Sequence, residues 1–284
     1  MVMDTKPFGW TAVEMPVIGQ GTWHMGESRH TRAAEITALQ LGLDLGLTHI
    51  DTAEMYGSGG AEALVAAAIR DRRRADLFLV SKVLPEHASY TGTMRAAEHS
   101  LRRLGTDYLD LYLLHWPSRY PIGESMRAME TLVGAGKIRF LGVSNFTVDE
   151  MRAATATLTR ERLACNQVLY NLGHRGIERD LIPFCEREHV AVVGYTPFGD
   201  FPHTTSPQFQ LLAEIGATYG KTPRQVALCF LTRAPHVFTI PKSNNPEHVR
   251  ENAGAARFLL TAADRAAMDR AFPAPRRAVP LAMS

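Results

Sequence analysis

Residues 77–115, LFLVSKVLPEHASYTGTMRAAEHSLRRLGTDYLDLYLLH, contain the unit from which most of this chain is built. Two short apolar runs, Leu77–Lys82 and Leu109–His115, flank a longer stretch, Thr91–Leu104, whose apolar side chains recur at spacings of three and four. Short continuous apolar runs are typical of buried parallel strands, and the spacing in the middle stretch predicts a helix. A strand, a helix and their two loops need about 30 residues, which matches this unit.

The same pattern recurs along the chain. The runs that we predict to be strands are Val17–Trp23, Thr48–Asp51, Leu77–Lys82, Leu109–His115, Arg139–Ser144, Ala164–Tyr170, Ala191–Tyr195 and Val237–Ile240. The first seven begin 25–32 residues apart, whereas the eighth begins 46 residues after the seventh. Helical spacing is found between them in Arg32–Gly46, Thr91–Leu104, Ser125–Ala135, Thr147–Thr157 and Pro246–Ala256. Eight such units predict parallel strands covered by helices.

Two folds contain units of this kind, the (β/α)8 barrel and the doubly wound open sheet. The open sheet usually has a glycine-rich phosphate turn after its first strand, but here Gly19-Gln20-Gly21 is not followed by a third glycine at the expected position. We therefore predict an α/β fold of the (β/α)8 TIM-barrel type. Pro7–Met15 is predicted to be a hairpin that closes the bottom of the barrel, and Thr261–Phe272 an extra C-terminal helix. No composition break indicates a linker, so residues 1–284 are predicted to form one domain.

Composition excludes several classes of protein. The chain is 45% hydrophobic and 21% charged, which is typical of a globular protein, and its formal net charge of +2 is too small to indicate nucleic-acid binding. Cys165, Cys185 and Cys229 are far apart, so neither a disulfide framework nor a zinc site is predicted. No apolar run approaches the ~20 residues of a membrane span, and the N-terminus lacks a signal-peptide pattern. We expect a cytoplasmic protein without metal, membrane or nucleic-acid partners.

Polar side chains stand at the ends of the predicted strands. Asp51 ends the second run and is soon followed by Tyr56, Lys82 ends the third run, and His115 ends the fourth. Each alone has a structural explanation: a helix N-cap, a packed ring, a solvated strand end and a hydrogen-bonded core histidine. In a (β/α)8 barrel, however, the carboxyl ends of all strands meet at one rim, where active sites lie. An acid, a base and two groups of intermediate pKa would converge there, which predicts an active site.

Eight segments resemble the aldo-keto reductase family, in the family's order and over nearly the whole chain. They are IGQGTW (18–23), HIDTAEMYG (49–57), LVSKV (79–83), LDLYLLHWP (109–117), GKIRFLGVSNF (136–146), CNQVLYN (165–171), YTPFG (195–199) and IPKSNNPEHVREN (240–252). The nearest resemblance is to small bacterial members reported as methylglyoxal or diketogulonate reductases. It implies a (β/α)8 barrel that reduces aldehydes and ketones with NADPH and without a metal.

The resemblance assigns a catalytic tetrad to Asp51, Tyr56, Lys82 and His115. The reaction moves a hydride from the nicotinamide to a carbonyl carbon, and the carbonyl oxygen then needs a proton. A free tyrosine has a pKa near 10 and is a slow acid at neutral pH, whereas an adjacent ammonium stabilises the phenolate and lowers that pKa. We expect Tyr56 to donate the proton and Lys82 to lower its pKa. Asp51 would hold Lys82 charged, and His115 would orient the carbonyl.

The resemblance also assigns the residues that contact the cofactor. They are Gly21, Thr22, Trp23, Asp51, Ser144, Asn145, Gln167, Tyr195, Thr196, Pro197, Phe198, Gly199, Lys242, Ser243, Asn244, His248, Glu251 and Asn252. Ser144, Asn145 and Gln167 would bind the nicotinamide carboxamide, and Tyr195 would stack beneath the ring. Thr196–Gly199 corresponds to the pyrophosphate loop. Metal ligands are not among these residues.

The stretch Lys242-Ser243-Asn244 resembles the family's pocket for the adenosine 2′-phosphate, and Glu251-Asn252 the pair near the adenine. A cation and a hydroxyl suit a phosphate monoester. The family normally has an arginine six residues after the lysine, where this chain has His248. Arg250 lies two residues further, so on a helix it would point to a different face. We therefore expect NADPH to be preferred, with NADH as a weaker alternative.

Trp23, Tyr56, His115 and Trp116 are predicted to line an apolar substrate pocket above the nicotinamide. The tail after the last predicted helix, PAPRRAVPLAMS, is short, and family members with bulky substrates often have a longer loop here. We therefore expect an open site, small carbonyl substrates, and a monomer or weak homodimer. The segment Phe201–Pro207 is either a flap over the cofactor or an irregular surface loop.

Two other functions remain possible at this point. Some members of the family are auxiliary subunits of potassium channels that use bound NADPH as a sensor, and such proteins keep the tetrad. A turnover measurement on simple aldehydes separates them from a reductase. A metal-dependent barrel hydrolase would need clustered histidine and carboxylate ligands, but His115 stands alone on its predicted strand.

Overall fold

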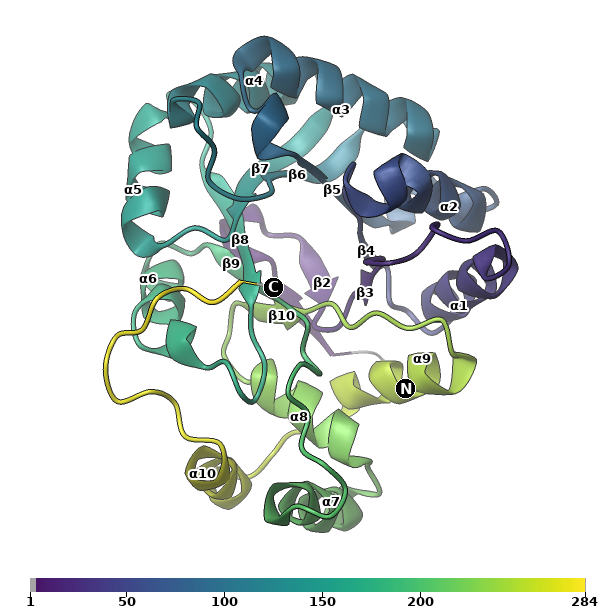
Figure 1. Cartoon of the computed structure of the whole chain (residues 1–284), viewed down its shortest axis with the longest axis vertical. Helices are drawn as coiled ribbons and strands as arrows, with labels where there is room; N and C mark the ends of the chain where they lie inside the picture. The colour runs from purple at the N-terminus through teal and green to yellow at the C-terminus, as the bar shows by residue number, and fades with distance from the viewer. Residues whose placement is uncertain (1–3, 284) are drawn as a thin grey trace.

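The computed structural model describes residues 4–283 and contains a ring of eight parallel strands (Figure 1). The strands are β3 (Gln20–Gly21), β4 (His49–Asp51), β5 (Phe78–Val83), β6 (Leu109–Leu114), β7 (Ile138–Ser144), β8 (Leu163–Leu169), β9 (Ala191–Tyr195) and β10 (Val237–Thr239). Each pairs with the next in chain order. The ring closes where the Gly19 N–H donates to the Thr239 carbonyl (2.8 Å) and the Thr239 N–H donates to the Val17 carbonyl (3.0 Å). The predicted (β/α)8 barrel is thus confirmed.

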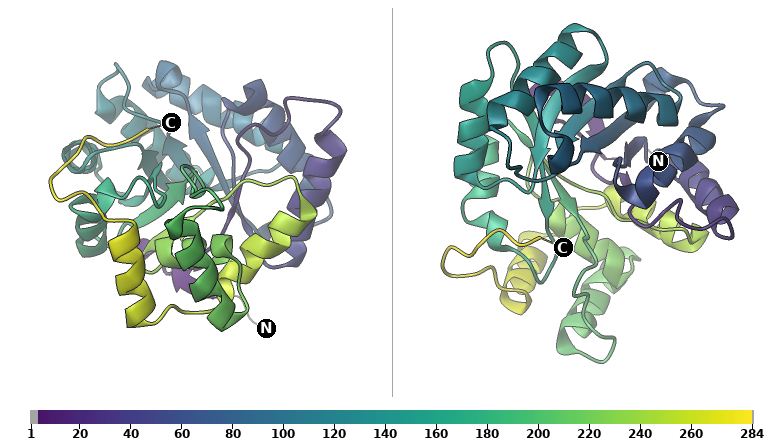
Figure 2. Two further views of the ribbon diagram at one scale, coloured as in Figure 1. Left: turned by 60° about the horizontal axis from the view of Figure 1, so that its bottom comes forward. Right: turned by 45° about the horizontal axis from the view of Figure 1, so that its top comes forward.

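Ten helices surround or flank this ring within residues 4–283 (Figures 1 and 2). They are α1 (Arg32–Asp44), α2 (Gly60–Ile69), α3 (Tyr90–Leu104), α4 (Ile122–Gly134), α5 (Val148–Thr157), α6 (Leu181–Arg187), α7 (Pro207–Tyr219), α8 (Pro223–Leu231), α9 (Pro246–Gly254) and α10 (Ala262–Ala271). The long gap before the last strand contains both α7 and α8. No helix in the described part of the chain is both long and apolar enough to cross a bilayer.

Side-chain caps fix where several helices begin. The Thr147 hydroxyl accepts a hydrogen bond from the Glu150 N–H, and the Glu150 carboxylate accepts one from the Thr147 N–H (2.7 Å), which completes the predicted capping box of α5. Thr261 and Asp264 form the same pair before α10. The Asn245 side chain caps α9 by accepting a hydrogen bond from the Glu247 N–H (2.8 Å). These local signals explain why the boundaries of these three helices could be predicted.

An N-terminal hairpin closes one end of the barrel, as predicted. It consists of β1 (Thr5–Pro7) and β2 (Glu14–Pro16), which are antiparallel. Phe8 in its loop is fully buried, and its ring centroid lies 5.2 Å from those of Phe78 and Phe238. These two rings belong to the first half of β5 and β10, so the hairpin covers the amino ends of the strands. Only the carboxyl ends remain for a site.

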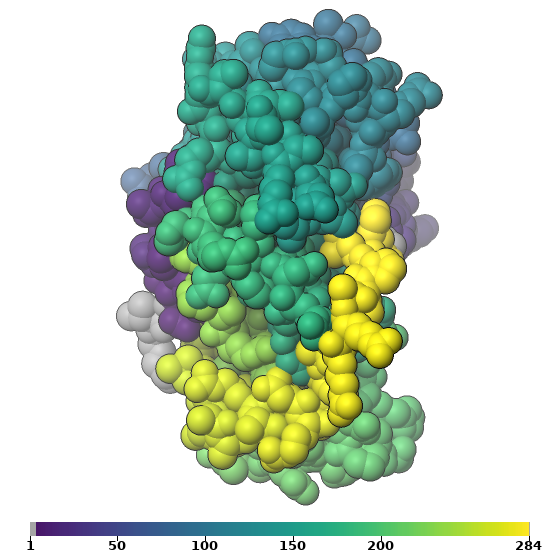
Figure 3. All heavy atoms as spheres, turned by 90° about the vertical axis from the view of Figure 1, so that its left-hand side faces the viewer, coloured from purple at the N-terminus to yellow at the C-terminus, as the bar shows by residue number. Residues whose placement is uncertain are grey.

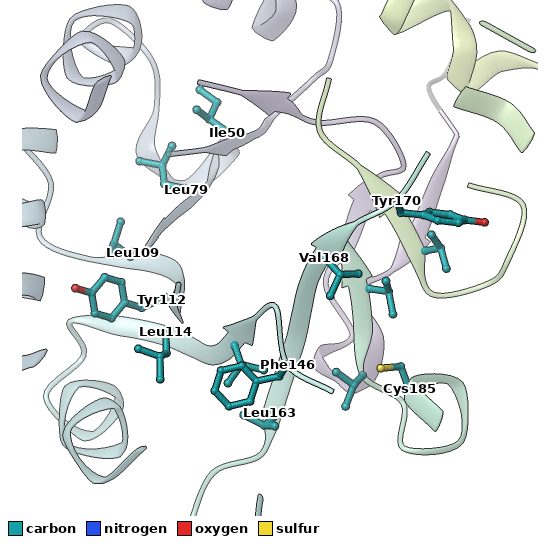
Figure 4. Packing of buried hydrophobic residues seen from close by; sticks show 14 of the residues in the cluster. Ile50, Leu79, Leu109, Tyr112, Leu114, Phe146, Leu163, Val168, Tyr170 and Cys185 are labelled. Atoms are coloured by element: carbon teal, nitrogen blue, oxygen red, sulfur yellow. The ribbon is translucent and has the colours of Figure 1, made fainter. Parts of the chain in front are cut away.

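Side chains alternate between two apolar layers along the strands. Tyr112 and Leu114 point toward the surrounding helices (Figure 4), whereas Val80, Leu111 and Val193 pack with Phe8 inside the barrel. The interior below the carboxyl ends is therefore filled with side chains rather than hollow. A packed interior holds the strand ends in fixed positions.

The C-terminal tail leaves α10 and returns to the open end of the barrel (Figures 1 and 3). The buried side chain of Arg175 holds its start, because the guanidinium binds Asp269 (2.6 Å) and donates to the Phe272 carbonyl. Arg179 donates to the Arg276 carbonyl (2.6 Å). The tail then runs along the surface until Met283 reaches the rim.

Candidate active site

A cavity of about 590 Å³ opens at the carboxyl ends of the strands. It is lined by Gly21, Thr22, Trp23, Asp51, Met55, Tyr56, His115, Trp116, Ser144, Asn145, Gln167, Tyr195, Thr196, Pro197, Phe198, Gly199, Ile240, Pro241, Lys242 and Met283. Residues at or after the carboxyl ends of seven of the eight strands therefore converge here, all except β5. A cavity of this volume can hold a small molecule together with part of a cofactor.

Three of the four tetrad residues form one hydrogen-bonded chain at the floor of this cavity. The Lys82 Nζ atom lies 2.6 Å from Asp51 Oδ2, 3.2 Å from the Tyr56 hydroxyl and 3.0 Å from the Thr52 carbonyl. Lys82 is completely buried and Asp51 is nearly so. All three ammonium protons thus have acceptors, which is the condition for keeping a charge in the interior. The ring of His115 lies beside that of Tyr56, with 5.7 Å between centroids.

The charge state of this chain follows from burial and pairing together. Burial disfavours a charged Lys82, but Asp51 and Tyr56 outweigh it and raise the lysine pKa above its ordinary value. Burial also raises the pKa of Tyr56, and Lys82 offsets this only in part. Lys82 thus acts on the Tyr56 pKa in the expected downward direction, but desolvation of the phenolate is the larger effect and the pKa lies above its ordinary value. Tyr56 is protonated and Lys82 is charged at neutral pH.

His115 is neutral in this environment. Burial and the nearby charge of Lys82 lower its pKa from 6.5 to about 2. Its Nδ1 atom is buried and has no hydrogen-bond partner among residues 4–283, while the residue lines the cavity. A neutral imidazole can donate one hydrogen bond without adding a second positive charge beside Lys82.

Amide side chains from neighbouring strands surround the tetrad. Gln167 donates from Nε2 to Asp51 Oδ1 (2.7 Å), so both carboxylate oxygens of Asp51 are hydrogen-bonded. Asn145 accepts a hydrogen bond from the Tyr195 hydroxyl (2.9 Å) and donates one to the His115 carbonyl (3.1 Å). Asn145 has φ = 61°, a left-handed conformation that asparagine tolerates better than most residues. The contact between Gln167 and Asp51 joins residues 116 positions apart, and no local sequence signal indicates it.

The structure brings the predicted cofactor residues together only in part. Those up to position 242 line the cavity. Ser243 and Asn252 lie at a small adjoining cavity, and the Ser243 hydroxyl accepts a hydrogen bond from the Asn245 N–H (3.1 Å). Glu251 accepts a hydrogen bond from the Thr222 hydroxyl, and His248 is exposed. These residues of α9 and the loop before it thus lie outside the large cavity but next to it, because the small cavity shares Gly21 and Pro241 with it.

Several features of the cavity fit a bound dinucleotide. A Cβ atom on Gly21 would lie 2.7 Å from the Ile240 carbonyl oxygen, so only glycine leaves room at this wall. Asn252 is buried, and its Oδ1 atom has no hydrogen-bond partner among the described residues. Lys242 lines the cavity with an exposed side chain, and it forms no ion pair within residues 4–283. The Asn252 oxygen is an acceptor that a base amino group could satisfy, and the Lys242 ammonium is a cation suited to a phosphate.

Two walls of the cavity differ from our expectations. Met283 lines the cavity, so the short tail reaches the site, which the sequence analysis did not predict. The tail reaches this far because it turns back from α10 instead of ending beside it. Met55 is a second lining residue that the sequence analysis missed. Trp23 and Trp116 line the cavity as predicted, with Trp23 46% exposed at its edge.

The segment Phe201–Pro207 connects the cavity wall to α7. The ring of Phe201 packs edge-on against that of Phe198, which lines the cavity, with 5.8 Å between centroids. Phe201 also contacts Phe209 in the first turn of α7 (6.4 Å). The segment is therefore attached to the wall at one end and to a helix at the other. Whether it closes over a cofactor stays a prediction.

Comparisons with known proteins agree with this geometry. A model of the aldo/keto reductase family matches residues 17–272. Methylglyoxal reductase YeaE of Escherichia coli is 42% identical over 266 residues, which cover 93% of each chain. Methylglyoxal reductase DkgB of Yersinia pestis is 30% identical over 259 residues, which cover 89% of this chain and 92% of the relative. The crystal structure of an aldo-keto reductase from Klebsiella pneumoniae in complex with NADPH superimposes with a TM-score of 0.93 at 45% identity, covering 100% of both chains.

Proposed function

Because the chain belongs to the aldo/keto reductase family, we propose that it reduces small aldehydes and ketones to alcohols with NADPH, and that Tyr56 donates the proton. The observation that supports this assignment best is the buried chain Asp51–Lys82–Tyr56, which ends in a hydroxyl that lines the cavity. A hydroxyl hydrogen-bonded to an ammonium is suited to protonating a carbonyl oxygen. We propose that one domain, residues 1–284, performs the whole reaction.

The residues around the cavity would hold the cofactor along its length. We propose that Ser144, Asn145 and Gln167 bind the carboxamide, that Tyr195 contacts the nicotinamide face, and that Gly21–Trp23 and Asp51 form the walls beside it. Thr196–Gly199 would bind the pyrophosphate. Lys242, Ser243, Asn244 and His248 would bind the 2′-phosphate, and Glu251 and Asn252 would bind the adenine. When bound, NADPH supplies the hydride that the carbonyl carbon receives. The NADPH complex of the Klebsiella relative supports this choice of cofactor.

Tyr56 acts as the general acid in this proposal. Its pKa is raised by burial, so the hydroxyl keeps its proton at neutral pH until a carbonyl oxygen with developing negative charge takes it. Lys82 then stabilises the phenolate through the 3.2 Å hydrogen bond, and Asp51 holds the ammonium in place. The neutral His115 donates a hydrogen bond to the same carbonyl oxygen and so orients it.

The walls of the cavity favour a small substrate. Trp23, Trp116 and Met283 supply apolar surface to the cavity. Two of the relatives are named methylglyoxal reductases, which supports 2-oxoaldehydes as the first substrates to test. A 2-oxoaldehyde such as methylglyoxal is small, so we expect the part of the cavity next to the tetrad to hold it.

The test is the variant Tyr56→Phe, which keeps the ring and removes the acid. We expect turnover of methylglyoxal to fall by ~10²–10⁴-fold, because that is the usual contribution of general acid catalysis. The affinity for NADPH, measured by fluorescence titration, should be unchanged. Near-normal turnover in the variant would overturn the role of Tyr56, and NADPH binding by the wild type without turnover of any aldehyde would favour a sensor.

A further inference from the structure

Arg224, the second residue of α8, stacks on two aromatic rings beside the cavity. Its guanidinium carbon lies 4.6 Å from the ring centroid of Phe198 and 5.0 Å from that of Phe201. Phe198 lines the cavity, and both rings belong to the segment that follows β9. The two rings therefore hold the guanidinium in one orientation at the edge of the proposed cofactor groove.

The Arg224 guanidinium has no counterion in the part of the chain that the structure describes. Within residues 4–283, Arg224 forms neither an ion pair nor a hydrogen bond through its side chain. Five of the seven other stacked arginines among residues 4–283 bind a carboxylate as well as a ring: Arg74, Arg139, Arg152, Arg175 and Arg233. The two others without an ion pair, Arg119 and Arg162, stack on Tyr120 and Trp10, which do not line the cavity. A half-buried arginine that is oriented by apolar contacts and has a free fork of donors is suited to binding an anion.

Arg224 lies between the cavity wall and the helix of the proposed phosphate pocket. On one side it contacts Phe198. On the other side the same turn of α8 is attached to α9, because the Thr222 hydroxyl donates to Glu251 and Gln225 Nε2 donates to the Glu251 carbonyl (2.8 Å). Helices α8 and α9 lie side by side in Figure 1. The anion that Arg224 faces would thus bind beside Phe198, which packs against the apolar cluster that contains Val249 of α9.

The proposed phosphate pocket is short of positive charge. Lys242 is its only cation before α9 begins, and Glu247 places a carboxylate in the first turn of that helix. His248 occupies the position at which the family pattern has an arginine. A phosphate dianion in this pocket would therefore need a further cation from another element.

We infer that Arg224 supplies the guanidinium that binds the adenosine 2′-phosphate of NADPH, in place of the arginine absent from position 248. This inference rests on the proposed function. An arginine binds phosphate through two parallel hydrogen bonds, and stacking on Phe198 and Phe201 reduces the side-chain entropy that binding costs. Arg224 is thus a specificity-determining residue that separates NADPH from NADH.

The test measures the binding of both cofactors to Arg224→Leu, Arg224→Lys and the control Arg250→Leu by fluorescence titration. Arg250→Leu removes the same charge from an exposed position on α9. We expect Arg224→Leu to weaken NADPH binding by about 10- to 100-fold, the usual value of one charged hydrogen-bonded contact, and to change NADH binding by no more than about twofold. Arg224→Lys should retain part of the preference, and Arg250→Leu all of it. Competition by adenosine 2′,5′-bisphosphate should weaken in parallel with NADPH.

Equal losses for NADPH and NADH would overturn the inference, because they would mean that Arg224 only holds Phe198 in place. Unchanged NADPH affinity in a folded Arg224→Leu would also overturn it. In both cases a wild type that prefers NADPH leaves the proposed function intact, whereas a wild type that does not bind NADPH overturns both. If Arg224→Leu does not fold, Arg224→Gln, which keeps a long polar stem, decides by the same comparison.

Discussion

The two ends of the proposed cofactor groove are built differently. At the reacting end, Asp51, Lys82 and Tyr56 are buried at the ends of paired strands or just after them, and hydrogen bonds connect all three. At the adenosine end, Lys242 and His248 are exposed on a loop and a helix terminus and have no ion-pair partner in the part of the chain that the structure describes.

This difference corresponds to two different requirements. Proton transfer needs groups within hydrogen-bond distance, so the reacting end is fixed by the sheet and by the packed interior below it. Binding an adenosine phosphate needs charge in the right region, and we expect it to tolerate several sources of that charge. Changes at the reacting end should therefore reduce turnover, and changes at the adenosine end should alter cofactor affinity.

The largest expected effect is that of Lys82→Met. Without the ammonium, the phenolate of Tyr56 loses its stabilisation, so the pKa of Tyr56 rises further and turnover at neutral pH falls by ~10²-fold or more. A pH–rate profile of the reduction measures this. The matched change at the other end, Lys242→Met, should weaken NADPH binding and leave the maximal rate nearly unchanged. A loss of turnover in Lys242→Met as large as that in Lys82→Met would contradict the proposed difference in function between the two ends of the groove.

A second prediction concerns His49, which is fully buried inside the barrel two residues before Asp51 and has no hydrogen-bond partner for either ring nitrogen among residues 4–283. Burial lowers its pKa from 6.5 to about 4. Between these pH values the unfolded chain binds a proton at His49 that the folded chain does not bind. The contribution of the neutral His49 to the free energy of unfolding is therefore fully present above pH 6.5 and is lost as the pH falls toward 4.

The loss at acid pH amounts to up to about 3 kcal/mol. Urea unfolding of His49→Leu at pH 7 and pH 4.5 should therefore show a smaller acid loss than the wild type. The exposed His99→Leu serves as the control and should keep the wild-type pH dependence. An identical acid loss in His49→Leu would show that the barrel interior tolerates the charged ring.

Gly21 lies between the two ends of the proposed cofactor groove, where the first and last strands of the barrel meet. Its replacement tests how rigid this junction of strands is. The new Cβ atom in Gly21→Ala would lie 2.7 Å from the backbone oxygen of Ile240, so the closing strands must shift. We expect a loss of about 1–3 kcal/mol in the free energy of unfolding. Gly134→Ala near the end of α4, where nothing lies within 4 Å of the added carbon, should be neutral or slightly stabilising. Equal stabilities of the two variants would contradict the steric argument.

The smallest expected effect is a gain at the adenosine end. His248→Arg places a permanent charge on the exposed face of α9, and we expect NADPH to bind several-fold more tightly while NADH binding hardly changes. Parallel titrations of the two cofactors measure it. Tighter binding of NADH by the same factor would mean that the added charge does not act on the 2′-phosphate.

The sequence predicted the parts of the fold that depend on local pattern. The period of strands and helices predicted the barrel, and Thr147 and Asn245 marked the starts of α5 and α9. The sequence pattern did not predict the positions of α2, α6, α7 and α8, and the long gap before β10 was interpreted only as a loop. Strand β3 is shorter than predicted, because Val17–Gly19 and Thr22–Trp23 continue the chain without joining the regular ladder.

The site was predictable wherever a strand end determines the position of a side chain. Asp51, Lys82 and His115 follow from the barrel topology, because their strands end at one rim. The raised pKa of Tyr56 could not be predicted, since desolvation depends on how completely the surrounding loops cover the ring. The contact of Met283 with the cavity was also missed, because a tail without helical or strand period has no predictable path.

The return of the tail to the rim has a practical consequence for handling the protein. A purification tag or fusion partner attached after Met283 would lie next to the cavity that we propose as the substrate site. The N-terminal hairpin, in contrast, lies at the closed end of the barrel, where Asp4 is hydrogen-bonded to Ala256 (3.0 Å). Tags and surface tethers should therefore be attached at the N-terminus, where they leave the entrance clear.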